Sequence, residues 1–288
     1  MMEIDANIVV ETEHLGSNNG IVCTREGLVL IDTPHRPSDA VRWRRRAESM
    51  GETRYLLQTD HHIDHTMGNV FFGGTIVSHE MTRERLLNAA PTRQYLKDLL
   101  AVIDPDGTMY IDLENYRVRL PTVTYRGSMT LHVGGLDFEF THLPGHTRNS
   151  SIIYIPQQQV LFTGDLVCES SLPAFIEADT FAWIEAVRHI EAMDVRYLIP
   201  GHGQVCDKAM ATTFRGWIED LVGEVETRLD KGMPRDEVAR EVAYEDRIHY
   251  STGGSPDYPQ HLIDLFIRRS IETIYDQILE RRAAGPAA

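Results

Sequence analysis

Histidine and aspartate are concentrated in one short segment of this sequence. Three of its 13 histidines fall within residues 60–65 (DHHIDH), directly after an apolar run, residues 55–58, that is predicted to be a strand. Zinc and similar cations take neutral imidazole nitrogen and carboxylate oxygen as ligands. A tight loop after a strand can direct several such groups at one point, so the segment is a candidate metal site.

Three later segments each place a histidine or an aspartate beside glycine at the predicted end of a strand. They are residues 143–147 (LPGHT), 163–165 (TGD) and 199–203 (IPGHG). Glycine permits a tight turn and a close approach of the backbone. Each apolar strand therefore delivers one potential ligand to a turn, namely His146, Asp165 or His202.

The four segments, in this order, resemble the hallmark of the metallo-β-lactamase superfamily, which includes glyoxalase II and many lactonases. The hallmark reads H-x-H-x-D-H, then a histidine in a P-G-H-T-type turn, then G-D, then G-H. The resemblance runs from about residue 8 to about residue 205. It implies an α/β fold, the four-layer αβ/βα sandwich, with two central sheets, helices outside, and metals at one edge between the sheets.

The resemblance also implies a dinuclear metal site, with two divalent ions that share one carboxylate. Zn²⁺ fits imidazole and carboxylate ligands best, and Mn or Fe is also compatible with them. The implied first site comprises Asp60, His62, His146 and the bridging Asp165, and the implied second site comprises Asp64, His65, His202 and Asp165.

The sequence departs from the hallmark at its opening position, which holds Asp60 and not histidine. Asp60 would ligate through oxygen and give a harder, more negative site. Alternatively, its shorter side chain would leave the first site weak or empty. As a third alternative, His61 would swing in as a substitute, although strand alternation predicts that His61 points elsewhere. The ligands of the second site are intact in all three cases.

This ligand set predicts a metal-dependent hydrolase. A metal ion lowers the pKa of bound water to about 7, so that metal-bound hydroxide is available at neutral pH. Such a hydroxide would cleave an acyl-type bond, as in a lactone, an amide, a thioester or a β-lactam. Asp64 would act as the catalytic residue, because it can hold metal and accept a hydrogen bond from the nucleophile.

Two other functions compete with hydrolysis. Relatives of the same fold hold iron and carry out redox chemistry, for example as persulfide dioxygenases, and bound iron with oxygen consumption would favour that function. A degenerate, non-catalytic member is the second alternative, supported only by Asp60. The presence of all the other implied ligands argues against it.

A small, partly hydrophobic substrate is expected from two apolar segments near the predicted metal edge. The loop after Asp165 carries Leu172, Phe175 and Ile176, and the stretch over residues 79–126 carries Tyr110 and Tyr116. These five side chains are candidates for the pocket wall, with core packing as the alternative.

The chain is predicted to form one domain over residues 1–288. Residues 79–126 are expected to be a helical and irregular insertion near the site, and residues 207–288 are expected to be C-terminal helices on the same domain. Asp179 is predicted to be the N-cap of a helix, because an apolar helical pattern follows it.

Composition excludes several classes of partner. The formal net charge of −15 argues against nucleic acid and anionic membranes, which require a basic surface. The three cysteines form no CxxC pair, and the N-terminal residues lack the pattern of a signal peptide. A cytoplasmic protein with a small-molecule substrate is therefore expected. The C-terminal helices would offer a homodimer surface, which the sequence does not require.

Overall fold

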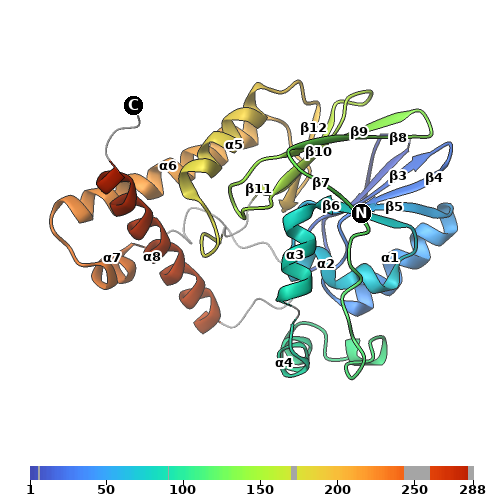
Figure 1. Cartoon of the computed structure of the whole chain (residues 1–288), viewed down its shortest axis with the longest axis horizontal. Helices are drawn as coiled ribbons and strands as arrows, with labels where there is room; N and C mark the ends of the chain where they lie inside the picture. The colour runs from blue at the N-terminus through green and yellow to red at the C-terminus, as the bar shows by residue number, and fades with distance from the viewer. Residues whose placement is uncertain (6, 90, 170–173, 243–259, 285–288) are drawn as a thin grey trace.

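The computed structural model describes residues 1–5, 7–89, 91–169, 174–242 and 260–284, and its strands form two sheets (Figure 1). The seven-stranded sheet follows chain order: β1 (Met2–Asp5), β2 (Ile8–Glu11), β3 (Asn19–Thr24), β4 (Gly27–Ile31), β5 (Thr53–Leu57), β6 (Thr75–His79) and β7 (Val123–Tyr125). The five-stranded sheet has the order β12 (Tyr197–His202), β11 (Val160–Cys168), β10 (Ser151–Ile155), β9 (Leu136–His142) and β8 (Ser128–Val133).

The two sheets face each other across a layer of apolar side chains. Val29 and Leu57 from the first sheet belong to the same buried cluster as Phe140 and Ile153 from the second. A fully buried side chain of this kind contributes about 1.5–3 kcal/mol to stability. The layer therefore holds the sheets together without help from the polar groups at their edge.

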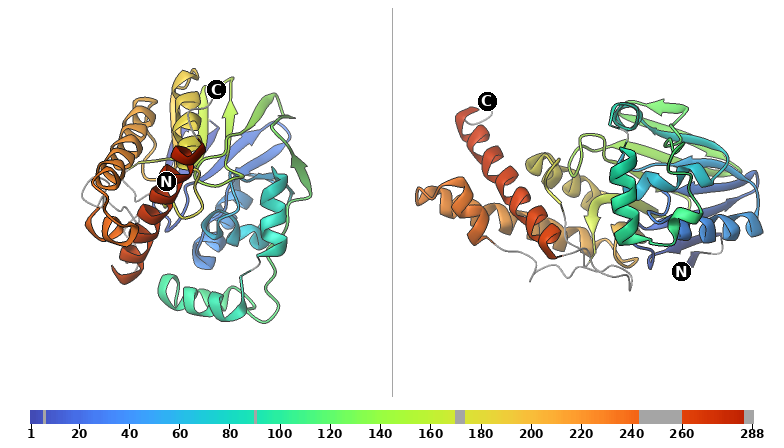
Figure 2. Two further views of the ribbon diagram at one scale, coloured as in Figure 1. Left: turned by 60° about the vertical axis from the view of Figure 1, so that its left-hand side comes forward. Right: turned by 90° about the horizontal axis from the view of Figure 1, so that it is seen from below.

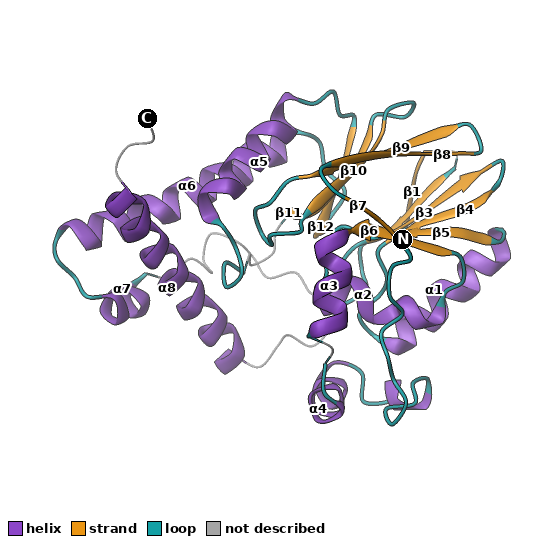
Figure 3. Cartoon of the chain, viewed as in Figure 1, coloured by secondary structure: helices purple, strands orange, loops and turns teal. Residues whose placement is uncertain are grey.

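Helices cover the outer face of each sheet (Figure 3). On the first sheet, Trp43 of α1 (Pro37–Met50) packs in one buried cluster with Leu30 and Leu56. On the second sheet, helix α5 (Thr180–Ala192) and α6 (Ala209–Asp230) share a cluster with Leu161 and Leu198. The order helix, sheet, sheet, helix confirms the predicted αβ/βα sandwich.

The C-terminal helices α6, α7 (Arg235–Glu241) and α8 (Gln260–Ala284) gather at one end of the molecule, beside α5 (Figure 2). Phe214 of α6 and Ile274 of α8 are fully buried in the same cluster as Trp183 of α5. Asp179 caps α5 as predicted, because its side chain accepts a hydrogen bond from the Ala182 N–H at 3.0 Å. Within the described ranges, no helix is both long and apolar enough to cross a membrane.

The structure divides the stretch that was expected to be one insertion. Its first residue, His79, ends β6, and residues 123–125 near its other end form β7, so both ends of the stretch belong to the first sheet. Between these strands lie α3 (Glu80–Asn88), α4 (Arg93–Ile103) and the 3-10 helix η2 (Gly107–Met109). The inserted part is therefore shorter than residues 79–126.

Candidate metal centre

Four strands and the turns that follow them deliver the candidate ligands to one edge of the sandwich. The loop after β5 leads into α2 (Ile63–Thr66) and the 3-10 helix η1 (Met67–Phe71), and carries residues 60–65. The turn between β9 and β10 carries His146, β11 carries Asp165, and β12 ends at His202. Because β11 and β12 are parallel, their carboxyl ends meet at the same edge.

The predicted second site is brought together as one group. Ligand atoms of Asp64, His65, Asp165 and His202 all lie within 4.8 Å of one another. His202 Nε2 is 3.2 Å from Asp64 Oδ2 and 3.3 Å from Asp165 Oδ1. His65 Nε2 lies 3.3 Å from the same oxygen of Asp165.

The predicted first site is also brought together, and it includes Asp60. Ligand atoms of Asp60, His62, His146 and Asp165 lie within 4.8 Å of one another. Asp60 Oδ2 is 3.2 Å from His62 Nδ1, while Asp60 Oδ1 accepts a hydrogen bond from the His62 backbone N–H at 2.8 Å. His146 Nε2 lies 3.3 Å from Asp165 Oδ2. Asp165 thus presents one oxygen to each group.

A glycine makes room for the shared carboxylate. A Cβ atom at position 201 would lie 1.9 Å from Asp165 Oδ1 and 2.7 Å from the Asp165 backbone nitrogen. No side chain can be accommodated at those distances. Gly201 of the IPGHG segment therefore lets β12 approach β11 at the point where Asp165 sits.

The residues present fit metal ions, because the cluster contains buried polar atoms that lack hydrogen bonds. In the described part of the chain, no hydrogen-bond partner reaches Asp60 Oδ2, His65 Nε2 or Asp165 Oδ1, although all three atoms are buried. Buried polar atoms without partners cost about 1–3 kcal/mol each. Imidazole nitrogens and carboxylate oxygens that face one another in this way form a donor set suited to divalent cations.

The charged groups of the cluster stabilise one another. Burial by itself would lower the pKa of His62, but Asp60 and Asp64 raise it to about 9. Burial also opposes the charge of His202, whose pKa is nevertheless raised to about 10, chiefly by Asp165. Burial would raise the pKa of Asp165, but the histidines around it hold that pKa well below its usual range. The carboxylates of the cluster are therefore ionised at neutral pH, as metal ligands must be.

One buried carboxylate that supports the cluster was not found from the sequence. Asp32, at the end of β4, lies 2.9 Å from His65 Nδ1 and accepts hydrogen bonds from Thr59 N–H at 2.9 Å and Thr59 Oγ1 at 2.6 Å. A carboxylate on the second ring nitrogen fixes the tautomer and orientation of a ligating histidine. The signal was available, because an aspartate directly follows a buried strand that neighbours β5.

His61 points away from both groups of candidate ligands. Its Nδ1 lies 2.8 Å from Asn149 Oδ1, and its Nε2 accepts a hydrogen bond from Arg85 Nε at 3.3 Å. Glu177 is 3.5 Å from the same Nε2. With both ring nitrogens engaged, His61 is badly placed to substitute for Asp60.

The structure places the predicted wall residues that it describes in different surroundings. Phe175 is fully buried in the core against Trp183, and Tyr116 is buried with its hydroxyl donating to the Met67 carbonyl at 3.2 Å. Phe175 fills core space, as the core alternative states, while Tyr116 belongs to a buried cluster and also lines a separate cavity of about 320 Å³. Tyr110 is exposed on the surface, and Ile176 does line a cavity. Leu172 lies outside the described residues.

Comparisons with known proteins agree with this geometry. The chain is 24% identical over 188 residues to a probable hydroxyacylglutathione hydrolase of Schizosaccharomyces pombe, covering 63% of the chain and 61% of that protein. It is 26% identical over 169 residues to a human acyl-coenzyme A thioesterase, covering 55% and 60%. A linear primary-alkylsulfatase of a Pseudomonas strain is 23% identical over 133 residues, covering 42% and 25%. The chain thus covers less than two thirds of each of these hydrolases.

Solved structures share the fold. A metallo-β-lactamase family protein from Thermus thermophilus matches with a TM-score of 0.69 at 15% identity, covering 98% of this chain and 96% of that one. An inverting sec-alkylsulfatase from Pseudomonas matches with a TM-score of 0.66 at 18% identity, covering 100% and 52%. Such low identities show the fold alone. A sequence model of the metallo-β-lactamase superfamily matches residues 13–202, and the chain belongs to that superfamily.

Proposed function

We propose that this protein is a metal-dependent hydrolase with a dinuclear centre. The observation that carries the proposal is the position of Asp165, whose two carboxylate oxygens face two separate groups of histidine and aspartate side chains. Bound divalent ions would lower the pKa of a water molecule and polarise the bond to be cleaved. Three hydrolases among the relatives support this class of reaction.

Asp60 is proposed as a working ligand of the first ion. Its Oδ2 lies in the group of candidate ligands, and the hydrogen bond from the His62 N–H holds its other oxygen. With Asp60, Asp64 and Asp165, the centre contributes three negative charges toward two divalent ions. Zn²⁺ is the proposed metal, and the extra carboxylate also makes the first site compatible with Mn²⁺ or Fe²⁺.

Asp64 is proposed to move a proton during the reaction. Its Oδ2 faces His202 at 3.2 Å and His65 at 3.8 Å, so this oxygen is committed to the second group. Its other oxygen, Oδ1, would accept a proton from the attacking water. A carboxylate can do this at neutral pH only when it is ionised, and burial would raise the pKa of Asp64, but His65 and His202 lower it.

The proposed substrates contain an acyl-type bond, and thioesters are the first to test. Two of the relatives are described as hydrolases of hydroxyacylglutathione and of acyl-coenzyme A, which are both thioesters. Lactones, amides and β-lactams are the other members of the proposed class.

The test is metal removal and restoration on a panel of thioesters, lactones and β-lactams. Chelation is expected to abolish hydrolysis, and two equivalents of Zn²⁺ are expected to restore it. Equal hydrolysis before and after chelation would contradict the proposal. Purification with iron and metal-dependent oxygen consumption, without hydrolysis of any panel member, would favour the redox alternative instead.

A further inference from the structure

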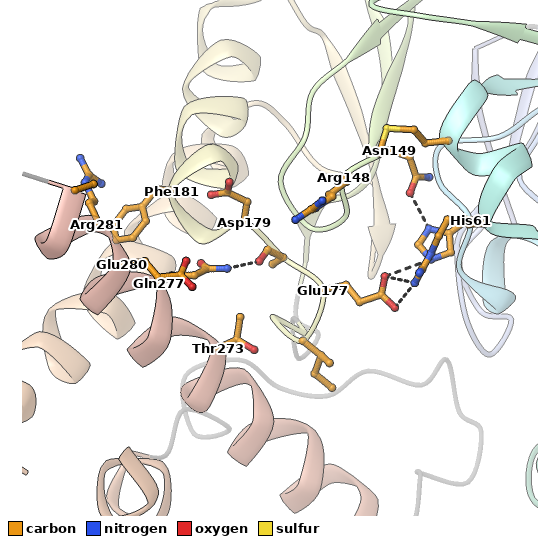
Figure 4. Close-up of a pocket in the computed structure, with 15 residues that line it drawn as sticks. His61, Arg148, Asn149, Glu177, Asp179, Phe181, Thr273, Gln277, Glu280 and Arg281 are labelled. Atoms are coloured by element: carbon orange, nitrogen blue, oxygen red, sulfur yellow. Dashed lines mark hydrogen bonds and ion pairs between the residues drawn. The ribbon is translucent and has the colours of Figure 1, made fainter. Parts of the chain in front are cut away.

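A cavity of about 940 Å³ lies beside the metal centre, between the core and helix α8 (Figure 4). It shares two wall segments with that centre. His61 lines the cavity, while its neighbours Asp60 and His62 are candidate metal ligands of the first group. Arg148 also lines it, two residues after His146 in the same turn. Adjacent residues of one loop therefore serve the two sites.

The far and near walls of the cavity are tied to the rest of the molecule. On the near side, Arg85 of α3 donates two hydrogen bonds to Glu177, at 2.6 and 2.7 Å. On the far side, Gln277 of α8 donates to the Ala178 carbonyl at 2.6 Å and accepts from the Thr180 N–H at 2.9 Å. A cavity with walls fixed in this way binds a ligand at a lower cost in conformational entropy.

Arg85 is already paired with Glu177, and a metal ion at this point would have to compete with that pair. His61, His62 and Glu177 could otherwise hold one, since their ligand atoms lie within 4.8 Å of one another. Nη2 of Arg85 donates to both oxygens of Glu177, which is the carboxylate that such an ion would need. The arginines of the wall without a carboxylate partner are therefore found at other positions.

Two arginines on the wall have no carboxylate partner in the described residues. Arg148 is exposed and makes no side-chain ion pair, and its guanidinium extends into the cavity in Figure 4. Arg281 of α8 lies over the Phe181 ring, with its guanidinium carbon 4.3 Å from the ring centroid. A stacked guanidinium keeps its N–H donors available at the ring edge.

The acidic groups on the wall equal the arginines in number. Among the described wall residues, Glu177, Asp179 and Glu280 stand against Arg85, Arg148 and Arg281, so the formal charges balance. Glu177 is paired with Arg85, and Asp179 uses one oxygen to cap α5. The guanidinium groups of Arg148 and Arg281 are therefore local positive sites in a wall without net charge.

We propose that this cavity binds the anionic end of the substrate, a carboxylate or a phosphate carried on the leaving group, at the guanidinium groups of Arg148 and Arg281. Ile176, Met81 and Phe181 supply apolar wall for the linking chain. Guanidinium groups match carboxylate and phosphate oxygens in pairs, which gives specificity for these anions. The proposal rests on the proposed hydrolase function, because the cleaved bond would lie at the metal ligands.

The kinetic test compares three acetyl thioesters: of 3-mercaptopropionate, of 2-mercaptoethyl phosphate and of 2-mercaptoethanol. Arg148→Gln and Arg281→Gln are each expected to raise KM for the anionic thioesters about tenfold, because each removes one charged hydrogen-bonding group. KM for the neutral thioester should not change. The carboxylate and phosphate arms show which anion is preferred. Arg282→Gln is the control, because Arg282 pairs with Asp230 at 2.7 Å and does not line the cavity.

A binding test separates this proposal from the hydrolase assignment. Calorimetry compares 3-(propylthio)propanoate, a stable thioether, with its neutral alcohol analogue on the metal-loaded protein. The acid is expected to bind more tightly, and Arg148→Gln should weaken it about tenfold. Equal KM and equal binding for charged and neutral compounds would overturn the cavity proposal and leave the hydrolase proposal intact. Tighter binding of the acid, without hydrolysis of any thioester, would support the cavity proposal and contradict the hydrolase proposal.

Discussion

The two halves of the metal centre are built differently. In the second group, the His65 side chain is 0% exposed, and its ring is held from behind by Asp32, which Thr59 holds in turn. In the first group, the His62 side chain is 27% exposed, and buried His146 Nδ1 has no hydrogen-bond partner in the described residues. One ligand of the second group, His65, is therefore oriented by the core, whereas the histidines of the first group have no such support behind them in the described residues.

The support behind His65 leads us to expect different metal affinities and different roles for the two groups. A ligand oriented by buried hydrogen bonds loses little entropy when it binds metal, so the second group should hold its ion more tightly. The first group lies beside the loop of His61, which borders the cavity. It is therefore the half that a substrate would approach, and the half in which the hallmark histidine is replaced by Asp60.

Removal of the shared carboxylate should erase the difference. Asp165→Ala takes away the oxygen that faces His65 and His202, and the oxygen that faces His146. Both ions and all activity should be lost, while the fold remains, because the apolar layer between the sheets is unaffected. Metal analysis and circular dichroism test this. The control is Asp137→Ala, which removes a surface carboxylate paired with His132 and should retain both ions. An Asp165→Ala protein that keeps two ions would contradict the account.

A substitution behind the shared carboxylate should have a smaller effect on both halves. Gly201→Ala would force Asp165 to move, because the added Cβ would lie 1.9 Å from its Oδ1. Overpacking of this kind costs about 1–3 kcal/mol. Metal affinity and the melting temperature should both fall. Gly216→Ala is the matched control, since a Cβ there meets nothing within 4 Å in helix α6; equal behaviour of the two variants would argue against the close approach.

Loss of the support behind His65 should affect one half only. Asp32→Ala is expected to weaken the more tightly held ion about 10–100-fold, as is typical when the partner of a ligating histidine is lost. The other ion should bind almost as before. Asp32→Asn should rescue part of the affinity, because an amide oxygen can still accept from His65 Nδ1. Competition with a chromogenic chelator measures both affinities, and equal weakening of the two ions would remove the proposed asymmetry.

The smallest expected effect is a release of protons when metal binds. His62 and His202 have raised pKa values, about 9 and about 10 in the metal-free protein, so both are protonated at pH 7.5. Metal displaces these protons, and its affinity should therefore fall as the pH falls. In the metal-free protein, the raised pKa values add stability that is full below pH 6.5 and is lost as the pH rises toward 9–10. Calorimetry in buffers of different ionisation enthalpy counts the protons; a count of zero would refute these pKa shifts.

Local pattern was sufficient to select the candidate ligands that stand beside glycine. His146 follows β9, Asp165 lies within β11 and His202 ends β12, and the structure brings all three into the candidate site. Asp32 stands at an equivalent strand end, but its role depends on the ring of His65, 33 residues later in the sequence. Local patterns do not contain such a contact.

The wall of the pocket could not be predicted for the same reason. Phe175 and Ile176 are neighbours in sequence, yet one fills the core against Trp183 and the other lines the cavity. Arg148 and Arg281 are 133 residues apart and line the same cavity only because α8 packs back onto the end of the sandwich. Hydrophobicity predicts that a residue is buried, and tertiary packing decides which surface covers it.

Elemental analysis of the protein purified without added metal, after titration with Zn²⁺, tests the central claim most directly. Two tightly bound ions per chain are expected, with Asp60 completing the first group and with unequal affinities for the two ions. A single ion at saturation would contradict the dinuclear centre and would show that Asp60 does not replace the hallmark histidine.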